Sequence, residues 1–594
     1  MAFEQQKNIR LVILKNLVLP HTIPFFLFFL LAVYLTYPLL FNLGKLTTGF
    51  GDELLIAWIH SWVLHALSTS PFELFNANIF YPHQNTLAHS DLFLTTSLLS
   101  FLPLKLIGEP IVAVNFTLIT SLALLGFTVY LLTFYITKNI YVSFISGVLV
   151  IFSPAVLDKK VHLQILSIYF VPLAILFFLI FIKRLQKKYL LLSLMCFLLQ
   201  TYNSFLPGYF ILFSYVVITL CLFIYNKTLF RKLITRETVV LFLFSLLLLV
   251  PIIIPYYQVS KQFNYTRDLR DAIHFSLQPE DFLFMDNTSR LKPIISNIFS
   301  FKNYPKSTEF KNGYLGLEFS LLTIFSFFYL FKKFEKKNIV ISSFLIIALI
   351  GLILSLGPAL HLGGKTIHNP FPIPLPYALF YYILPGFSGF RNSARWEMLF
   401  IIFMAVVIGI VLQEKLKNVE SKLKIGIYIF LCAAIIGEYN FPIQFYSAPQ
   451  KNAFPSVHQW LITSSPDISF IELPIYDWDM HPYVTEELKR GYYSTIHFRK
   501  MVNGYSGFFP PDWLELVPYL SNNFPSEESI VRIKNIGVNY IIVDKDQYDL
   551  LNKNKFKVRG KEFKNGDKVI ADLIKNEKVK LLKKFDNSYV FAFK

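Results

Sequence analysis

The sequence predicts a mainly α-helical protein that crosses a membrane many times and ends in a smaller α/β domain. Hydrophobic residues make up 54% of the 594 residues and charged residues only 16%, with a mean hydropathy of +0.50. Soluble domains carry about 25% charged residues, so this composition indicates a membrane protein. The apolar residues are also gathered into long stretches, and a helix of roughly 20 apolar residues crosses a bilayer.

Eleven stretches are apolar and long enough to be predicted as membrane-spanning helices, if the bilayer adapts to the shorter ones. They lie near residues 17–42, 110–136, 140–157, 163–182, 189–206, 208–225, 238–258, 316–331, 339–356, 396–414 and 425–440. Segment 92–107 is ambiguous, because Pro103 and Lys105 interrupt it and it could lie along the interface. We expect the first stretch to stay as a signal anchor, since it is longer than the core of a cleavable signal peptide.

Short basic clusters between the stretches predict the orientation. With eleven spans, the N-terminal cluster and those at 183–188, 231–236, 332–337 and 415–424 fall on one side, which the positive-inside rule makes cytosolic. The opposite side then holds every longer loop. These outer segments are 43–109, 157–162, 259–315, 357–395 and everything after 440. We therefore expect any chemistry to be extracytoplasmic.

The composition changes after Asn440, and the prolines that follow mark a linker. The strings ISFIELPIYD, RIKNIGVNYIIVD and KLLKKFDNSYVFAF alternate in the manner of strands and helices. The sequence thus predicts two domains: 1–440, a transmembrane domain with outer loops, and 441–594, a soluble extracytoplasmic α/β domain.

The net charge of +18 does not indicate a nucleic-acid partner. Much of it lies in the loop clusters that set topology, and no zinc-finger or RNA-binding motif accompanies it. The three cysteines fall inside apolar segments and give no disulfide or metal pattern.

The first outer loop holds an acidic pair, Asp52 and Glu53, directly before the helical pattern LLIAWIHSWVLHAL. Read as a helix, Glu53, His60 and Ser61 share one face, which predicts an amphipathic helix in the headgroup region. Asp52 either caps this helix or serves a lipid-bound substrate at the outer surface.

Further along the same loop, NIFYPHQNTLAHSDLF brings Tyr81, His89 and Asp91 to the outer face. Each is a candidate for substrate binding, although caps and an interfacial tyrosine would explain them equally well. A divalent metal held by Asp52, Asp91 and a histidine is conceivable, since hard cations take carboxylate oxygens. No fixed ligand spacing supports it, so no cofactor is certain.

Two other outer segments carry positive charge suited to a phosphate. FSPAVLDKKVHLQIL contains Lys159, Lys160, His162 and Gln164, and the two lysines break the positive-inside rule. LPGFSGFRNSARWEML contains Arg391 and Arg395, which would lie one turn apart if helical. A solvated turn and headgroup anchoring are the alternatives. In the C-terminal domain, MVNGYSGFFPPDW suits either sugar binding or a packed interface.

These strings, in this order, resemble a group of bacterial polytopic proteins with the GT-C glycosyltransferase architecture. The resemblance runs through GDELLIAW, NIFYPHQNTLAHSD, FSPAVLDKKVHLQIL, PGFSGFRNSARW and NGYSGFFPPDW, over most of the chain. It implies an enzyme of the bacterial cytoplasmic membrane and cell envelope. Such an enzyme moves a sugar, with inversion, from a polyprenyl-phosphate donor to a glycan, lipid or protein acceptor.

The resemblance also implies roles for the candidate residues. The pair at 52–53 is similar to that of the ArnT-like and protein mannosyltransferase branch, which makes Asp52 the general base with Glu53 beside it. Basic side chains would neutralise the departing lipid phosphate, and the others would orient donor or acceptor. The first group is Arg391, Arg395 and Lys159 or Lys160; the second is His89, Asp91, His162 and Gln164.

Two other classes are compatible with the sequence. A lipid or polysaccharide transporter or flippase would carry ionisable residues at mid-membrane and an inverted repeat, and neither is evident. A non-catalytic membrane scaffold that kept the GT-C architecture is the third reading. A cleft that holds Asp52 beside Arg391 or Arg395 would favour the enzyme.

Overall fold

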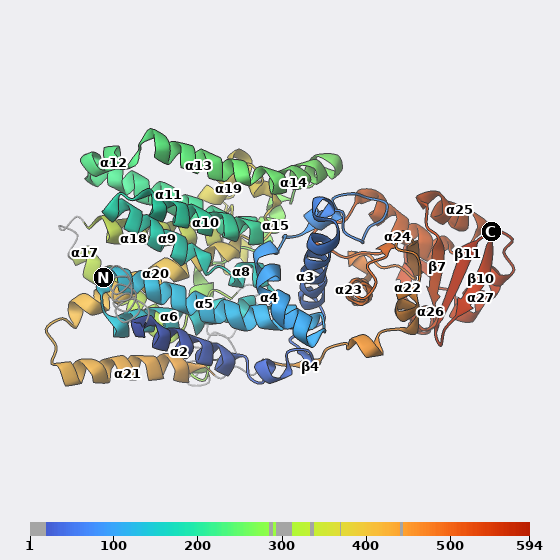
Figure 1. Ribbon diagram of the computed structural model, residues 1–594, viewed down its shortest axis with the longest axis horizontal. Helices are drawn as coiled ribbons and strands as arrows, with labels where there is room; N and C mark the ends of the chain where they lie inside the picture. The colour runs from blue at the N-terminus through green and yellow to red at the C-terminus, as the bar shows by residue number, and fades with distance from the viewer. Residues whose placement is uncertain (1–18, 284–288, 293–311, 333–337, 369, 440–442) are drawn as a thin grey trace, which may run out of the picture. The chain divides into compact units, whose positions relative to one another are not determined.

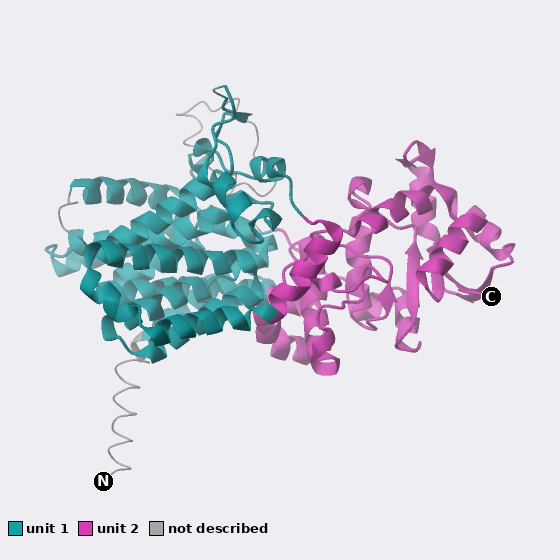
Figure 2. Ribbon diagram, turned by 90° about the horizontal axis from the view of Figure 1, so that it is seen from above, with its two compact units in different colours: residues 1–40, 117–250, 266–443 teal, residues 41–116, 251–265, 444–594 magenta. Residues whose placement is uncertain are grey.

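The computed structural model describes residues 19–283, 289–292, 312–332, 338–368, 370–439 and 443–594. Three predicted features therefore lie partly or wholly outside the described residues. They are the N-terminal basic cluster, loop 259–315 and the basic cluster at 332–337. The chain forms two compact units, which Figure 2 colours separately. Unit 1 comprises residues 1–40, 117–250 and 266–443. Unit 2 comprises 41–116, 251–265 and 444–594, so the first outer loop is grouped with the C-terminal region rather than with the helices around it in sequence.

Unit 1 is a bundle of apolar helices (Figure 1). Its helices are α2 (Leu19–Leu35), α5 (Ile111–Thr137, whose first residues belong to unit 2), α6 (Ile140–Ile151), α7 (Pro154–Leu157), α8 (Leu163–Leu166), α9 (Phe170–Arg184), α10 (Lys187–Asn203), α11 (Phe205–Tyr225), α12 (Lys227–Leu233), α13 (Arg236–Leu248), α15 (Leu269–His274), α17 (Leu317–Lys332), α18 (Ile339–Ser355), α19 (Pro376–Ile383), α20 (Glu397–Lys415) and α21 (Ser421–Glu438). Short 3₁₀ turns lie at η5 (Asp158–Val161), η6 (Pro279–Phe282), η7 (Phe387–Gly389) and η8 (Ser393–Trp396), and β2 (His361–Leu362) pairs with β3 (Lys365–Thr366).

Helices occupy the described part of every range that the sequence predicted to span the membrane. Within the described residues, four helices are long and apolar enough to cross by themselves, namely Ile111–Thr137, Leu163–Arg184, Phe205–Tyr225 and Ser393–Lys415. Two further pairs of helices are apolar but bent, namely Ile140–Ile151 with Pro154–Val161 and Arg236–Leu248 with Val250–Phe263. If each bent pair counts as one span, the number of spans rises to six. The protein is therefore a polytopic helical membrane protein, while eleven spans stays a prediction.

Helix α20 forms the core of unit 1. Nearly all of its residues from Glu397 to Leu412 are buried, as expected of a helix that is hydrophobic on every side. Small residues let its neighbours approach closely. A Cβ on Gly351 of α18 would lie 2.7 Å from the Phe400 backbone nitrogen, and one on Gly409 would lie 2.4 Å from the Ser146 hydroxyl of α6.

Unit 2 combines helices with a mixed sheet. It contains α3 (Asp52–Thr69), α4 (Leu94–Ile107), α14 (Val250–Phe263), α22 (Ser456–Ile462), α23 (Thr485–Ser494), α24 (Pro511–Asn523), α25 (Glu527–Ile536), α26 (Lys545–Lys553) and α27 (Gly566–Ile574), with 3₁₀ turns η2 (Leu39–Asn42, which begins in unit 1), η3 (Pro71–Glu73), η4 (Thr86–His89), η9 (Lys451–Ala453) and η10 (Trp478–Met480). Its strands are β1 (Leu46–Thr47), β4 (Tyr446–Ser447), β5 (Ser469–Leu473), β6 (Lys500–Met501), β7 (Tyr540–Asp544), β8 (Lys557–Val558), β9 (Lys561–Glu562), β10 (Val579–Lys584) and β11 (Ser588–Phe593).

The sheet has the order β10-β11-β7-β5-β6, in which β5 runs parallel to β6 and β7 while β11 runs antiparallel to β7 and β10. Every residue of β5 is buried, as expected of a strand covered on both faces. The predicted C-terminal α/β region is thus confirmed, with α25 and β7 at RIKNIGVNYIIVD and the hairpin β10–β11 at the chain end.

Segment 43–109, which the sequence predicted to be the first outer loop, is tied to the C-terminal region by backbone pairing within unit 2. Strand β1 pairs with β4, and the Tyr81 amide donates to the Met501 carbonyl over 2.9 Å. The Met501 amide in turn donates to the Asn78 carbonyl over 2.9 Å. These bonds extend the sheet edge at β6 with a segment from much earlier in the chain.

Part of the polar face predicted for α3 lies inside the protein. His60 is fully buried, and its Nε2 lies 3.1 Å from the Thr96 hydroxyl of α4. The Ser61 hydroxyl donates to the Ala57 carbonyl, which satisfies it inside the helix. These two polar groups have hydrogen-bond partners within the protein, whereas Ser68 near the end of α3 is exposed. The location of α3 in the headgroup region stays a prediction.

Candidate functional site

The acidic pair at the start of α3 divides between two environments. Gly51 is the N-cap, and Asp52 is the first helical residue, half-buried, at the end where the helix dipole favours a carboxylate. Glu53 is 3% exposed and closes the preceding turn, since it accepts the Thr48 hydroxyl over 2.9 Å and the Gly51 amide over 3.2 Å. Asp52 is thus the more accessible carboxylate of the pair.

Around His89, unit 2 forms a second polar group enclosed by aromatic rings. His89 is 1% exposed, and its Nδ1 lies 3.0 Å from the Tyr265 hydroxyl and 3.3 Å from the Phe508 carbonyl. Burial lowers the pKa of His89 to about 4, so the ring is neutral at physiological pH. His83 pairs with Asp512 over 3.1 Å.

The remaining predicted residues of this loop lie nearby in the chain. Tyr81 is half-buried and is held by its backbone bond to β6, and the Tyr256 hydroxyl donates to the Ser90 carbonyl beside Asp91 over 2.7 Å. Of these contacts, sequence reasoning missed Tyr265, Tyr256 and Asp512. They come from distant segments and carry no motif of their own.

In unit 1, Lys159 is committed to a buried ion pair. Its Nζ lies 2.8 Å from Glu397 Oε1 in α20 and 3.4 Å from Asp158 Oδ2. The Lys159 side chain is 3% exposed and that of Glu397 is completely buried. Sequence reasoning missed Glu397, although a carboxylate at the start of an apolar span is itself a signal.

His162 is the point on which two distant basic segments converge. It is 6% exposed, and burial lowers its pKa well below the ordinary value. The charges of Arg395, Lys159, Arg391 and Lys160 lower it further, in that order. The structure therefore brings the predicted strings at 158–164 and 391–395 together around one neutral imidazole within unit 1.

Local packing fixes the arginine segment. The Ser393 hydroxyl donates to the Ala272 carbonyl over 2.9 Å, and the Arg391 guanidinium lies 4.7 Å from the centre of the Phe275 ring. Arg395 belongs to η8, whereas Arg391 precedes it in irregular backbone, so the two are not on one helical face.

Several buried polar atoms around this cluster have no hydrogen-bond partner among the described residues. They are Gln164 Oε1, Ser153 Oγ, Asn392 Oδ1 and Trp396 Nε1. Such atoms are rare in native proteins, and each requires an explanation such as a bound molecule or water. All four lie in the two basic strings of unit 1, although similar atoms occur elsewhere among the described residues.

No group of three or more His, Cys, Asp or Glu side chains that could hold a metal ion occurs among the described residues. The metal site suggested for Asp52, Asp91 and a histidine is therefore not supported. The string MVNGYSGFFPPDW is largely structural. Its Asn503 side chain bonds both backbone groups of Glu472 in β5, at 2.7 and 2.9 Å, and Trp513 Nε1 donates to the Val502 carbonyl over 2.8 Å.

No protein-family profile and no curated protein matches the sequence. Among solved structures, the chain is similar to the arabinofuranosyltransferase AftD from Mycobacteria, with a TM-score of 0.52 and 12% identity over 96% of this chain and 40% of that one. This chain thus spans less than half the length of AftD.

Two weaker likenesses are to the oligosaccharyltransferase AglB from Archaeoglobus fulgidus, determined with an inhibitory peptide and a dolichol-phosphate, and to ArnT from Cupriavidus metallidurans. The AglB match has a TM-score of 0.45 and 12% identity over 90% of this chain and 70% of that one. The ArnT match has a TM-score of 0.33 and 12% identity over 91% and 93%. The likeness to AftD shows that this chain shares the fold of that arabinofuranosyltransferase.

Proposed function

We propose that this protein is a membrane glycosyltransferase that moves a sugar from a polyprenyl-phosphate donor to a glycan, lipid or protein acceptor outside the cytoplasm. The observation that carries the proposal is the convergence of Lys159, Lys160, Arg391 and Arg395 around His162 in a protein with the GT-C fold. We place it in the bacterial cytoplasmic membrane with a cytosolic N-terminus, following the positive-inside rule.

The cationic cluster suits a lipid phosphate that leaves during the reaction. Lys159 already has a counter-ion in Glu397, so its charge is largely balanced. Lys160, Arg391 and Arg395 are the other cations of the cluster, and a guanidinium matches two phosphate oxygens at once. Negative charge grows on the phosphate as its bond to the sugar breaks, and fixed cations stabilise that change more than they stabilise the bound substrate.

Asp52 is the general base in this proposal. It takes the proton of an acceptor hydroxyl while that oxygen attacks the anomeric carbon, and the bond from that carbon to the phosphate oxygen breaks. The products are the inverted glycoside, a protonated Asp52 and a polyprenyl phosphate. Asp52 is half-buried in the first turn of α3, where the helix dipole favours a carboxylate, whereas Glu53 closes the turn before it.

Neutral histidines and amides orient the substrates. His162 and Gln164 belong to the cationic cluster, and the Gln164 oxygen is buried without a partner among the described residues. A donor hydroxyl or phosphate ester group would satisfy such atoms. We propose that the acceptor binds near Tyr81, His89 and Asp91, because these residues belong to unit 2, as Asp52 does.

The test is sugar transfer in membranes supplied with a panel of radiolabelled polyprenyl-phosphate hexoses and pentoses. Wild type is expected to label an acceptor from at least one donor, and Asp52→Asn to reduce the rate about a hundredfold or more. Glu577→Gln is the matched control, because Glu577 is an exposed carboxylate in the turn before β10. Transfer by Asp52→Asn at the wild-type rate would remove the base assignment.

A further inference from the structure

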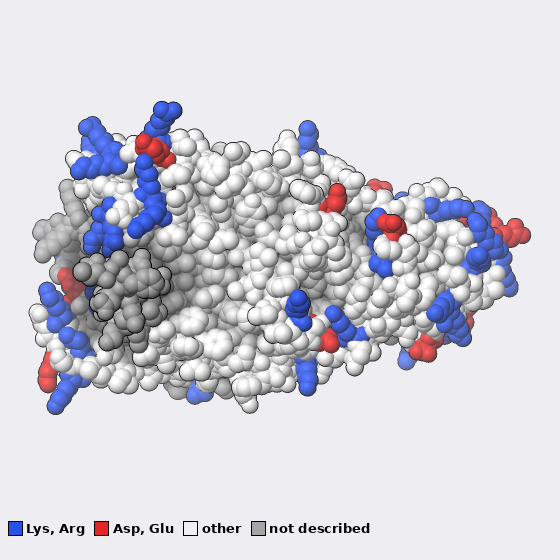
Figure 3. All heavy atoms as spheres, in the orientation of Figure 1, with Lys and Arg blue, Asp and Glu red and all other residues white. Residues whose placement is uncertain are grey.

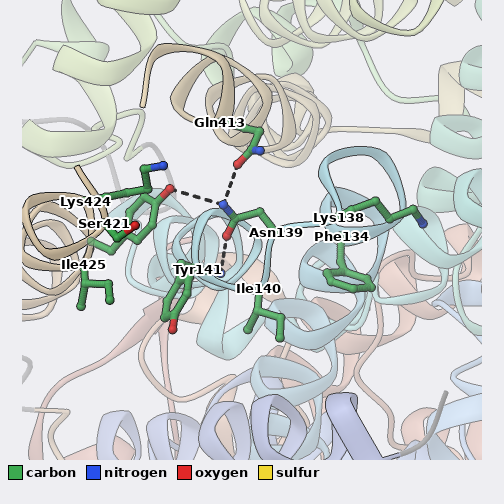
Figure 4. A pocket seen from close by; sticks show the side chains of 10 residues that line it. Phe134, Lys138, Asn139, Ile140, Tyr141, Gln413, Ser421, Lys424 and Ile425 are labelled. Carbon is green, nitrogen blue, oxygen red and sulfur yellow. Dashed lines mark hydrogen bonds between the residues drawn. The ribbon is translucent and has the colours of Figure 1, made fainter. Parts of the chain in front are cut away.

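A separate cavity of about 550 Å³ lies in unit 1, where α5 and α20 end and α6 and α21 begin (Figure 4). This volume is typical of sites for small molecules. None of the residues assigned above to sugar transfer lines it. The lining residues are Phe134, Lys138, Asn139, Ile140, Tyr141, Gln413, Ser421, Lys424, Ile425 and Tyr428.

Asn139 organises the polar side of this cavity. Its Oδ1 caps α6 by accepting from the Tyr141 amide at 2.9 Å. Its Nδ2 donates to Gln413 Oε1 at 2.6 Å and to the Tyr428 hydroxyl oxygen at 3.4 Å (Figure 4). Gln413 and Tyr428 each accept one hydrogen bond from Asn139, which orients their own N–H and O–H donors. Fixed donors of this kind favour an anion.

Two lysines of the lining add positive charge, and their side chains extend in opposite directions from Asn139 (Figure 4). Lys138 follows α5, and its Nζ lies 4.7 Å from the centre of the Tyr135 ring. Lys424 lies in the first turns of α21, and its Nζ donates to the Lys417 carbonyl over 3.3 Å. Burial, and then the charges of Lys183 and Arg184, lower the pKa of Lys138. An anion bound there would relieve this repulsion. No acidic residue lines the cavity.

The rest of the lining is apolar and flat. Phe134, Ile140 and Ile425 contribute hydrocarbon surface, and the rings of Tyr141 and Tyr428 stack with centres 5.3 Å apart. A free inorganic anion would gain nothing from this surface. A ligand with an anionic head and an apolar body would use both parts.

The position in unit 1 favours a membrane lipid as the source of that ligand. Lys and Arg side chains gather over α12 and the start of α21, whereas the flanks of the bundle carry few charges (Figure 3). The cavity thus lies at the basic ends of apolar helices, which is the level of phospholipid headgroups.

We infer that this cavity binds the phosphate headgroup of an anionic phospholipid, with Lys424, Gln413 and Tyr428 around the phosphate, the charge of Lys138 acting from the far side of Asn139, and the apolar residues along the glycerol and first acyl carbons. The basic side of the membrane is cytosolic by the positive-inside rule, so the lipid belongs to the inner leaflet. This inference stands independently of the proposed enzyme activity.

The test is native mass spectrometry of the purified full-length chain, titrated with phosphatidylglycerol and separately with phosphatidylcholine. Wild type is expected to retain one phosphatidylglycerol molecule in preference to phosphatidylcholine. The double variant Lys138→Gln/Lys424→Gln is expected to weaken that binding about thirtyfold, because each basic side chain contributes roughly a fivefold factor. Lys138→Arg/Lys424→Arg keeps both charges and is expected to keep the lipid.

The matched control is Lys227→Gln/Lys232→Gln, which removes two exposed charges of α12 that lie outside the cavity. Its phosphatidylglycerol affinity is expected to stay within about twofold of wild type, because exposed charges away from a site are largely screened by salt. Three results would overturn the inference. They are equal losses in the two Gln variants, no loss in the cavity variant, and displacement of the lipid by millimolar inorganic phosphate.

Discussion

Removal of Lys159 should destabilise unit 1 more than almost any other single change, because it strands a buried carboxylate. Glu397 is fully buried in α20, and the Lys159 ammonium at 2.8 Å balances its charge. In Lys159→Met the side chain keeps its length but loses the charge. Glu397→Gln is the reciprocal change, which leaves the buried ammonium with Asp158 alone, at 3.4 Å.

The structure sets the size of the effect. Breaking a buried pair by removing one partner costs about 3–5 kcal/mol, whereas replacing both partners by apolar residues is often close to neutral. Lys159→Met and Glu397→Gln should therefore each cost about 3 kcal/mol or more. The double variant Lys159→Met/Glu397→Met should recover most of this loss, since it leaves no uncompensated charge.

Thermal unfolding in detergent with a thiol-reactive dye measures this directly. Cys196 and Cys221 are buried in α10 and α11, so they react only as these helices open. A loss of this size corresponds to a lowering of Tm by roughly 5 °C, because the shift per kcal/mol decreases with protein size. Single variants that unfold within about 1 °C of wild type, or a double variant worse than both, would refute the buried ion pair.

Three further outcomes follow from other parts of the chain. Between about pH 7.5 and pH 5 the stability of unit 2 should fall by about 2 kcal/mol because of His89. The pKa of His89 is about 4 in the folded state and 6.5 ordinarily, so the unfolded state takes up the proton first as the pH falls. Thermal melts at several pH values should show a smaller fall in stability for His89→Gln. Glu53→Gln should cost roughly 1–2 kcal/mol in the same melts, because its amide group turns a donor toward either the Thr48 hydroxyl or a backbone amide; a melt identical to wild type would mean that Glu53 does not close the turn. Gly351→Ala should cost roughly 1–3 kcal/mol, since its Cβ would meet the Phe400 backbone nitrogen at 2.7 Å, and normal yield and Tm would contradict that close approach.

The apolar stretches predicted where the helices lie, because helix formation within a membrane depends chiefly on local composition. Alternation and turn residues likewise predicted the C-terminal strands. For helix α3, the polar spacing did not indicate that His60 would be buried. The partner of His60, Thr96 in α4, is a tertiary contact that the local pattern does not contain.

For the candidate site, the sequence indicated which strings carry chemistry but not how they combine. Lys159 and Arg395 stood out as charges in outer loops, yet the fold alone brings both to His162. The pairing of Lys159 with Glu397 was also missed, since ion pairs between distant segments leave no spacing to read. Glu53 appeared as the twin of Asp52, and only its two hydrogen bonds distinguish their environments.

The most direct test of the central claim is the affinity of the purified protein for polyprenyl phosphate, the leaving group that the cationic cluster is proposed to stabilise. We predict that Arg391→Gln/Arg395→Gln weakens this binding on the order of a hundredfold, since it removes two charge-assisted contacts. Lys187→Gln/Lys188→Gln, which removes two exposed charges elsewhere in unit 1, should leave the affinity unchanged. Equal affinity in wild type and both variants, with all three equally stable, would contradict the account.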